Sequence, residues 1–123
     1  MSMNPVNWFE IPVTDMMRAK EFYSSLLKME MTDMNMPEME MASFPFHQEG
    51  MGASGALVRH EHYKPSFDGT VICFSCEDCG NEIGMVEQLG GKIIMPKTSI
   101  GEHGFYAQAT DTEGNRISFH SMK

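Results

Sequence analysis

Basic residues are scarce in this 123-residue chain, which has 9 lysines and arginines against 17 aspartates and glutamates and a formal net charge of −8. This acidic excess argues against binding to a phosphate backbone. The chain also lacks an apolar run near the roughly 20 residues of a membrane span, and its first residues lack the features of a secretory signal. We therefore expect a cytoplasmic protein with no nucleic-acid or membrane partner.

Cysteine is scarce as well, and all three cysteines lie close together, at Cys73, Cys76 and Cys79. Their C-x2-C-x2-C spacing is similar to the beginning of an iron–sulfur ligand run, but the fourth cysteine is missing. Residues 70–76 are rich in β-branched and aromatic types and predict a strand, on which Cys73 and Cys76 point to opposite faces. We expect free, buried thiols in a reducing compartment rather than a cluster or a zinc site.

Methionine, in contrast, is abundant, with 14 residues in the chain. Six of them occupy positions 29, 31, 34, 36, 39 and 41, where they alternate with polar residues in three short runs. A period of two predicts a β-hairpin with the thioethers on one buried face, and Pro37 favours a turn between its strands. Cu(I) capture by the soft thioethers is the alternative to a core or pocket lining.

The order of the elements predicts a repeat. Residues 16–28 have apolar positions at helical spacing after a cap at Thr14 or Asp15, and residues 79–89 predict a second helix after Asp78. Strands are expected before, between and after these helices, at 4–13, in the two arms of the hairpin over 29–41 around the turn "NMPE", and at 52–60, 70–76, 92–97, 104–110 and 116–121. A shift of 63 residues, which places Trp8 on Val71, superimposes the two halves.

These halves are two βαβββ modules, at about 4–60 and about 69–122. A module of about 60 residues is small for an independent core, so we expect one domain over residues 1–123. The predicted class is α+β, with a curved mixed β-sheet and the helices outside. A concave sheet face of this kind is where a ligand is expected.

Five segments carry a family resemblance: residues 9–27, 55–58, 69–78, 86–97 and above all 104–121, "GFYAQATDTEGNRISFHS". Together with the repeat, they resemble the vicinal oxygen chelate (VOC) superfamily of glyoxalases, bleomycin resistance proteins and extradiol dioxygenases. The chain is most similar to the short glyoxalase-like proteins of that group. The resemblance implies the glyoxalase/bleomycin resistance/dihydroxybiphenyl dioxygenase fold and a homodimer.

Metal-using members of the superfamily place His, Gln or Glu side chains around one divalent ion. Carried over to this chain, those positions fall on Trp8, Val71 and Ser118, and on Ser54 or Ala56. None of these offers the carboxylate or imidazole donors that such an ion needs. Although the family implies a divalent metal, we therefore expect no metal and no other cofactor.

The alternation of side chains along a strand gives candidate site residues. Glu10 shares a face with Trp8, and Arg116 and His120 share a face with Ser118. The sequence leaves open whether the face of the preceding strand that carries Tyr106 and Gln108 looks inward. Our catalytic candidates are Glu10 and His120, and our ligand-binding candidates are Trp8, Tyr106, Gln108, Arg116 and Ser118.

Two functions fit these residues. One is metal-free binding of a small organic ligand in the sheet cleft, and the other is a glyoxalase-like lyase, isomerase or dioxygenase-like enzyme with Glu10 as the acid or base and His120 assisting. A purely structural ion pair is the competing role for Glu10. His60 and His62 have a spacing that can chelate on a strand, but we expect them in a loop.

Overall fold

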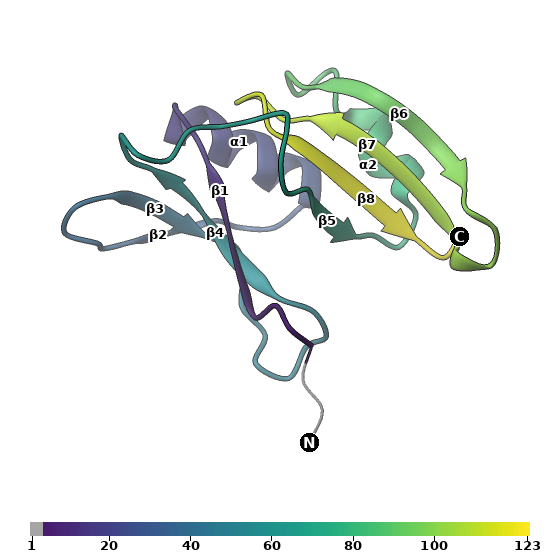
Figure 1. The fold of residues 1–123 in the computed structure, drawn as a ribbon, viewed down its shortest axis with the longest axis horizontal. Coiled ribbons are helices and arrows are strands. Elements are labelled where there is room, and N and C mark those ends of the chain that lie inside the picture. Colours follow the sequence, from purple (N-terminus) through teal and green to yellow (C-terminus); the bar gives the residue numbers. More distant parts are fainter. Residues whose placement is uncertain (1–3) are drawn as a thin grey trace.

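The computed structural model describes residues 4–123, where eight strands form two sheets of four (Figure 1). The first sheet has the order β1-β4-β3-β2 and the second has β5-β8-β7-β6. The pairs β1–β4 and β5–β8 are parallel and the others antiparallel, so both sheets are mixed. None of the helices in residues 4–123 is long and apolar enough to cross a membrane.

Each sheet belongs to one βαβββ module. The first module contains β1 (Trp8–Pro12), α1 (Met16–Leu27), β2 (Thr32–Met34), β3 (Glu40–Ser43) and β4 (Ser54–Arg59). The second contains β5 (Ile72–Ser75), α2 (Cys79–Met85), β6 (Lys92–Ser99), the 3-10 turn η1 (Gly101–His103), β7 (Phe105–Thr110) and β8 (Arg116–Ser121). The predicted α+β class and the pair of βαβββ modules are confirmed.

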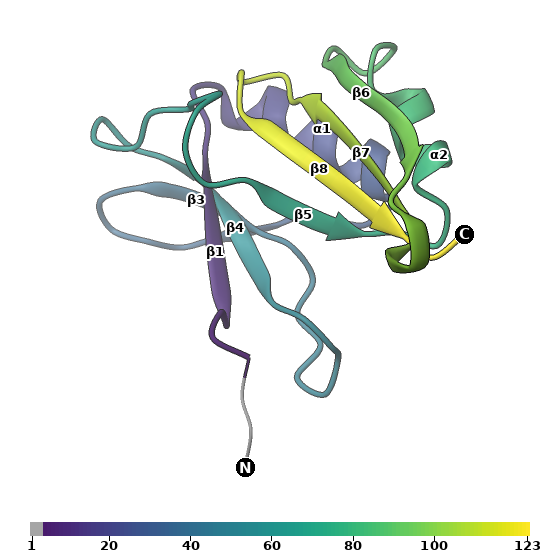
Figure 2. The same ribbon diagram turned by 45° about the vertical axis from the view of Figure 1, so that its right-hand side comes forward.

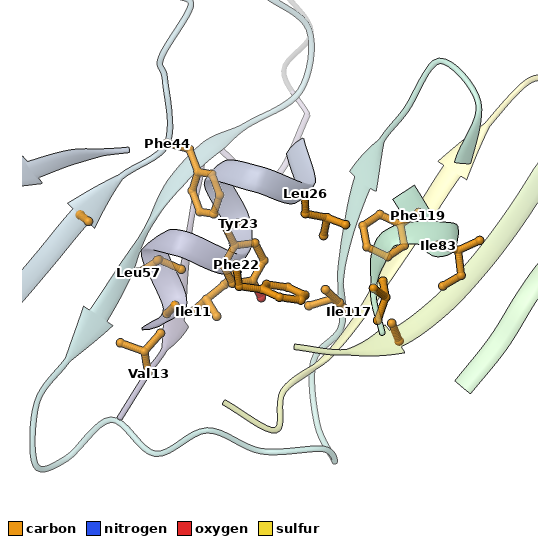
Figure 3. Close-up of a cluster of buried hydrophobic side chains, with 14 of the residues drawn as sticks. Ile11, Val13, Phe22, Tyr23, Leu26, Phe44, Leu57, Ile83, Ile117 and Phe119 are labelled. Atoms are coloured by element: carbon orange, nitrogen blue, oxygen red, sulfur yellow. The ribbon is translucent and has the colours of Figure 1, made fainter. Parts of the chain in front are cut away.

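The helix α1 packs against both sheets. The ring of Tyr23 lies 5.6 Å from that of Phe44, just after β3, and 5.9 Å from that of Phe74 on β5. Leu57 of β4 and Ile117 of β8 belong to the same buried cluster, on either side of α1 in Figure 3. The two modules therefore share one core.

The β7–β8 turn locks the modules together at the start of α1. The Glu113 side chain is 0% exposed, and its carboxylate accepts hydrogen bonds from the backbone amides of Thr14 and Asp15 at 2.8 and 2.9 Å. Arg18 donates to the same carboxylate at 2.7 and 3.0 Å. Burial alone would raise the pKa of Glu113, but the hydrogen bonds from Arg18, Asp15 and Thr14 outweigh it and lower the pKa to about 2.

A second polar group is buried beside this one. The hydroxyl of Tyr23 donates to Asp111, and the Asn115 side-chain amide donates to Asp111 at 3.0 Å and to the carbonyl of Pro12 at 2.8 Å. Burial and the Asp111 carboxylate raise the pKa of Tyr23 well above its ordinary value. These bonds satisfy polar groups that would otherwise destabilise the core.

The methionine-rich segment forms a shorter hairpin than predicted. Met34 of β2 lies opposite Met41 of β3, and Met41 is only 6% exposed in a cluster with Ala56 and Val58. Met36 is 45% exposed, because it lies in the connection between the strands, where its amide bonds the Met34 carbonyl at 3.2 Å. The expected single buried face holds for Met34, Met39 and Met41, which share one cluster. It is wrong for Met36, for Met29, which is 38% exposed, and for Met31, which packs against the main core instead.

The three cysteines are free thiols, but the expected burial is wrong for Cys73 and holds fully only for Cys79. Cys73 is exposed on β5, Cys76 follows that strand and Cys79 is buried at the start of α2. Burial and the nearby Glu82 carboxylate raise the pKa of Cys76 to about 12. The thiol is therefore protonated at neutral pH and a poor nucleophile.

Candidate functional site

Each sheet has one face that its helix does not cover, which we call the free face; in Figure 2 that of sheet two lies toward the viewer. On sheet one, Trp8 and Glu10 project from this face, opposite the buried Ile11. The Glu10 carboxylate accepts a hydrogen bond from the hydroxyl of Tyr63 at 3.0 Å and from the indole N–H of Trp8 at 3.4 Å. The bond to Glu10 and its charge raise the pKa of Tyr63. Two donors thus orient the carboxylate.

Five predicted site residues share the free face of sheet two. Tyr106 lies opposite His120, and Gln108 lies opposite Ser118, while the residues that alternate with them on β7 are buried under α2. Arg116 is on the same face of β8 by alternation. The register therefore answers the question that the sequence leaves open, because Tyr106 and Gln108 face the same side as the β8 candidates.

Arg116 is held in place by its neighbours. Its guanidinium carbon lies 3.9 Å from the ring centre of Phe67, and its Nε donates to the Phe67 carbonyl at 3.2 Å. A longer contact of 3.5 Å runs to the Gln108 oxygen, and the Gln108 amide donates to the hydroxyl of Tyr106 at 3.0 Å. Arg116 takes part in none of the ion pairs within residues 4–123, so an oriented cation is presented on the free face.

Ser118 and His120 are placed differently from Arg116. Ser118 is 0% exposed, and its hydroxyl has no hydrogen-bond partner within the described residues. His120 is half-buried, and its Nε2 lies 2.6 Å from the carbonyl oxygen of His103 in η1. No hydrogen bond between the described residues joins His120 to Glu10.

Glu10 and Arg116 line one small depression of about 50 Å³ where β1 passes β5 and β8. A larger pocket, of about 590 Å³, opens beyond the end of β1 and includes Tyr63, Arg59 and Lys64. Tyr63 lines this pocket and also donates to Glu10. Tyr63 therefore connects the larger pocket to the Glu10 carboxylate, which itself lines the small depression.

The sequence itself identifies the family. Residues 6–119 match the model of the Glyoxalase/Bleomycin resistance protein/Dioxygenase superfamily. The chain belongs to this superfamily. No curated protein matches this glyoxalase-like chain in sequence.

Solved structures share the fold of this superfamily member. Glyoxalase I of Leishmania major, described as trypanothione-dependent, has a TM-score of 0.74 at 18% identity, with 98% of this chain and 88% of that chain covered. A variant of glyoxalase I from Zea mays has a TM-score of 0.72 at 18% identity, and this chain spans 47% of its length with 96% of its own. TnmS3, an antibiotic-binding protein from Streptomyces sp. CB03234, has a TM-score of 0.67 at 20% identity, with 98% of both chains covered.

The residues at the carried-over metal positions do not fit a divalent ion. Trp8 directs its indole N–H to Glu10, Ser54 donates to the carbonyl of Pro45 at 2.7 Å, and Ser118 is enclosed. Within residues 4–123, no three His, Cys, Asp or Glu side chains converge as a metal site would require. His60 and His62 lie in a tight turn, as expected for a loop, because the Tyr63 amide bonds the His60 carbonyl at 3.0 Å.

Two residues of this glyoxalase-like site were missed by the sequence reasoning. Tyr63 and Phe67 lie in the segment between β4 and β5, where alternation along a strand predicts no direction. They contact Glu10 and Arg116 from 53 and 49 residues away. Their only signal is that they are aromatic residues in the segment that connects the two modules.

Proposed function

We propose that this superfamily member is a metal-independent cytoplasmic protein that binds a small organic ligand on its free faces. Two observations together carry the proposal: polar side chains are held in fixed orientations on the free faces, and the residues at the family's metal positions cannot bind a divalent ion. Glu10 and Arg116 are each held by neighbouring aromatic residues, and both line one depression. Side chains that are already held in place lose little conformational entropy when a ligand binds.

The chemistry of Glu10 and Arg116 suggests which ligand groups they recognise. Arg116 offers N–H donors to a carbonyl or an anionic group, while Glu10 accepts from a hydroxyl, an amine or a cation. Trp8 is 38% exposed beside them and offers an aromatic surface. A ligand with an apolar body and polar groups of both kinds satisfies all three.

Removing metal is expected to leave both stability and ligand binding unchanged. The test is a thermal-shift screen of small organic compounds on protein dialysed against EDTA and on undialysed protein, with the metal content of both samples measured. A ligand at 100 times its dissociation constant stabilises the folded state by about 2.7 kcal/mol. Stoichiometric nickel, zinc, iron or manganese that is needed for binding would overturn the proposal.

Replacing Glu10 with glutamine is expected to abolish binding of a ligand found in that screen. The amide keeps the shape of the side chain, so the free energy of unfolding should change by less than about 1 kcal/mol. Glu30→Gln, at an exposed position outside the site, is the matched control. If Glu10→Gln lowers the melting temperature while affinity is intact, Glu10 is a structural residue and the assignment fails.

An enzyme is the second candidate, because the Glu10 carboxylate is both oriented by two donors and open to solvent on the free face. Such a group can act as a general base. For any compound of the screen that is converted to product, Glu10→Gln should then lower kcat by about 100-fold or more, with KM little changed. Loss of affinity without any product would favour the binding protein.

We also propose a homodimer, which the apolar edge of sheet two supports. The strand β6 is the outer strand of that sheet, and its Ile93, Ile94 and Met95 are 38%, 43% and 37% exposed. An exposed apolar edge strand of this kind is normally covered by a partner. Light scattering at micromolar concentration should give twice the 13.9 kDa of one chain, and a value of one chain mass would reject the dimer.

A further inference from the structure

A separate pocket opens on the opposite side of β1 from Glu10. It has a volume of about 180 Å³ and lies between the β3–β4 loop, the end of α1 and β5. Phe9, which alternates with Trp8 and Glu10 on β1, lines it together with Phe44 and Phe74. We call it the seam pocket, because it is bounded by both modules.

The walls of the seam pocket are aromatic. The ring of Phe9 lies 5.5 Å from that of Phe44 and 6.1 Å from that of Phe74, and Phe44 and Phe74 are 5.9 Å apart. None of the three pairs is face-to-face, so ring edges and faces are both available to a further ring. At the rim, Phe46 and Met51 are 64% and 103% exposed.

The lining also excludes a charged occupant. Among residues 4–123, it contains no lysine, arginine, aspartate or glutamate, and His47 is the only ionisable side chain that lines it. The hydroxyl of Ser54 is already bonded to the carbonyl of Pro45 at 2.7 Å. An ion moved from water into this pocket would lose its hydration without gaining a carboxylate, ammonium or guanidinium partner.

From these features we propose that the seam pocket is a second ligand site, which binds a small neutral aromatic molecule. The size fits one ring, alone or fused to a second, because an apolar cavity of about 150 Å³ is known to bind benzene. Such a ligand would bury Phe46 and Met51, whose exposure otherwise costs free energy. The site goes beyond the proposed function, since it uses neither Glu10 nor Arg116.

The methionine methyl groups allow a direct test on the unmodified full chain. Met29 and Met51 line the seam pocket, whereas Met34 and Met41 lie on the free face of sheet one. In protein with 13C-labelled methionine methyls, phenol and indole should shift the signals of Met29 and Met51 saturably and leave the other two in place. Benzoate, which is charged, and cyclohexanol, which has no aromatic ring, should bind at least tenfold more weakly than phenol.

Two substitutions complete the test. Ala53→Trp places an indole at an exposed position of the pocket lining and should weaken phenol binding at least tenfold, whereas Met17→Trp, on an exposed position of α1, should not. Glu10→Gln should leave phenol binding intact, which separates this site from the free faces. Phenol-induced shifts that are larger at Met34 and Met41 than at Met29 and Met51 would overturn the proposal, as would benzoate binding as tightly as phenol. It would also be overturned if the signals of Met29 and Met51 shift with the protein concentration and not with the phenol concentration.

Discussion

Replacing Glu113 with alanine is expected to lower the free energy of unfolding by about 2 kcal/mol, as measured by urea denaturation. The Glu113 side chain is 0% exposed, so its loss leaves a void at the start of α1. It also removes the acceptor for the amides of Thr14 and Asp15, and it leaves the Arg18 guanidinium without its 2.7 Å partner. The Arg18 side chain is 49% exposed, so water can solvate it after the substitution, and the loss comes mainly from the void and the broken hydrogen bonds.

Two variants serve as controls for this prediction. Glu113→Gln keeps the shape and one carbonyl acceptor, so it should destabilise less than alanine. Glu30→Ala removes a carboxylate from an exposed position and should change stability by no more than about 0.5 kcal/mol. If Glu113→Ala is no less stable than Glu30→Ala, the β7–β8 turn does not lock the modules together.

The Glu113 carboxylate should also make the free energy of unfolding depend on pH in the acidic range. Its pKa is about 2 in the folded protein, below the ordinary value of 4.5 that it regains on unfolding. The contribution of a group with a lowered folded pKa is complete above the unfolded pKa and is lost as the pH falls toward the folded one. Between pH 5.5 and 3 the urea midpoint should therefore fall more steeply for the unmodified protein than for Glu113→Gln. Parallel curves would contradict this assignment.

The fold was predictable because its signals are local and are repeated. The start of α1 follows from a capping residue, and Asp15, one of the two predicted caps, accepts the bond from the Arg18 amide at 3.1 Å. The predicted end of the second helix at Leu89 is wrong, since α2 ends at Met85. The Val86 amide there bonds the Ile83 carbonyl at 3.4 Å, and tight turns of this kind preserve apolar spacing without continuing the helix.

Only part of the site could be predicted, because the alternation of side chains predicts the face of a residue only when that residue is in a strand. It placed Glu10 beside Trp8, and the structure adds that their side chains are hydrogen-bonded. It gave no means of finding Tyr63, since that contact depends on how a loop folds back onto β1. The sequence analysis grouped His120 with Glu10 because both were expected on inward-facing strand positions. In the structure the His120 ring contacts η1 instead.

The methionine-rich hairpin illustrates the same limit at the scale of single residues. The alternation identified two strands, but it gave the same weight to every methionine from 29 to 41. The register separates them, because Met41 is covered by Ala56 and Val58 whereas Met36 lies in the connection. Substitutions at these two positions should therefore differ greatly, although the sequence around each is similar.

Replacing Met41 with glutamate is expected to destabilise the protein by at least about 3 kcal/mol and to lower its melting temperature by on the order of 10 °C. Met41 is 6% exposed, and its neighbours Ala56 and Val58, both 0% exposed, have apolar side chains that offer a carboxylate no partner. An ion buried without a partner either keeps its desolvation cost or must take up a proton.

Met36→Glu introduces the same charge at a position that is 45% exposed, so it should change stability by no more than about 0.5 kcal/mol. Met39 is half-buried against the same cluster, and Met39→Glu should fall between the two. This order follows from burial alone, because all three variants add one negative charge to the same short hairpin. Equal melting temperatures for Met41→Glu and Met36→Glu would show that the hairpin does not bury Met41. The assignment of Met41 to a buried cluster on the free face of sheet one would then be wrong.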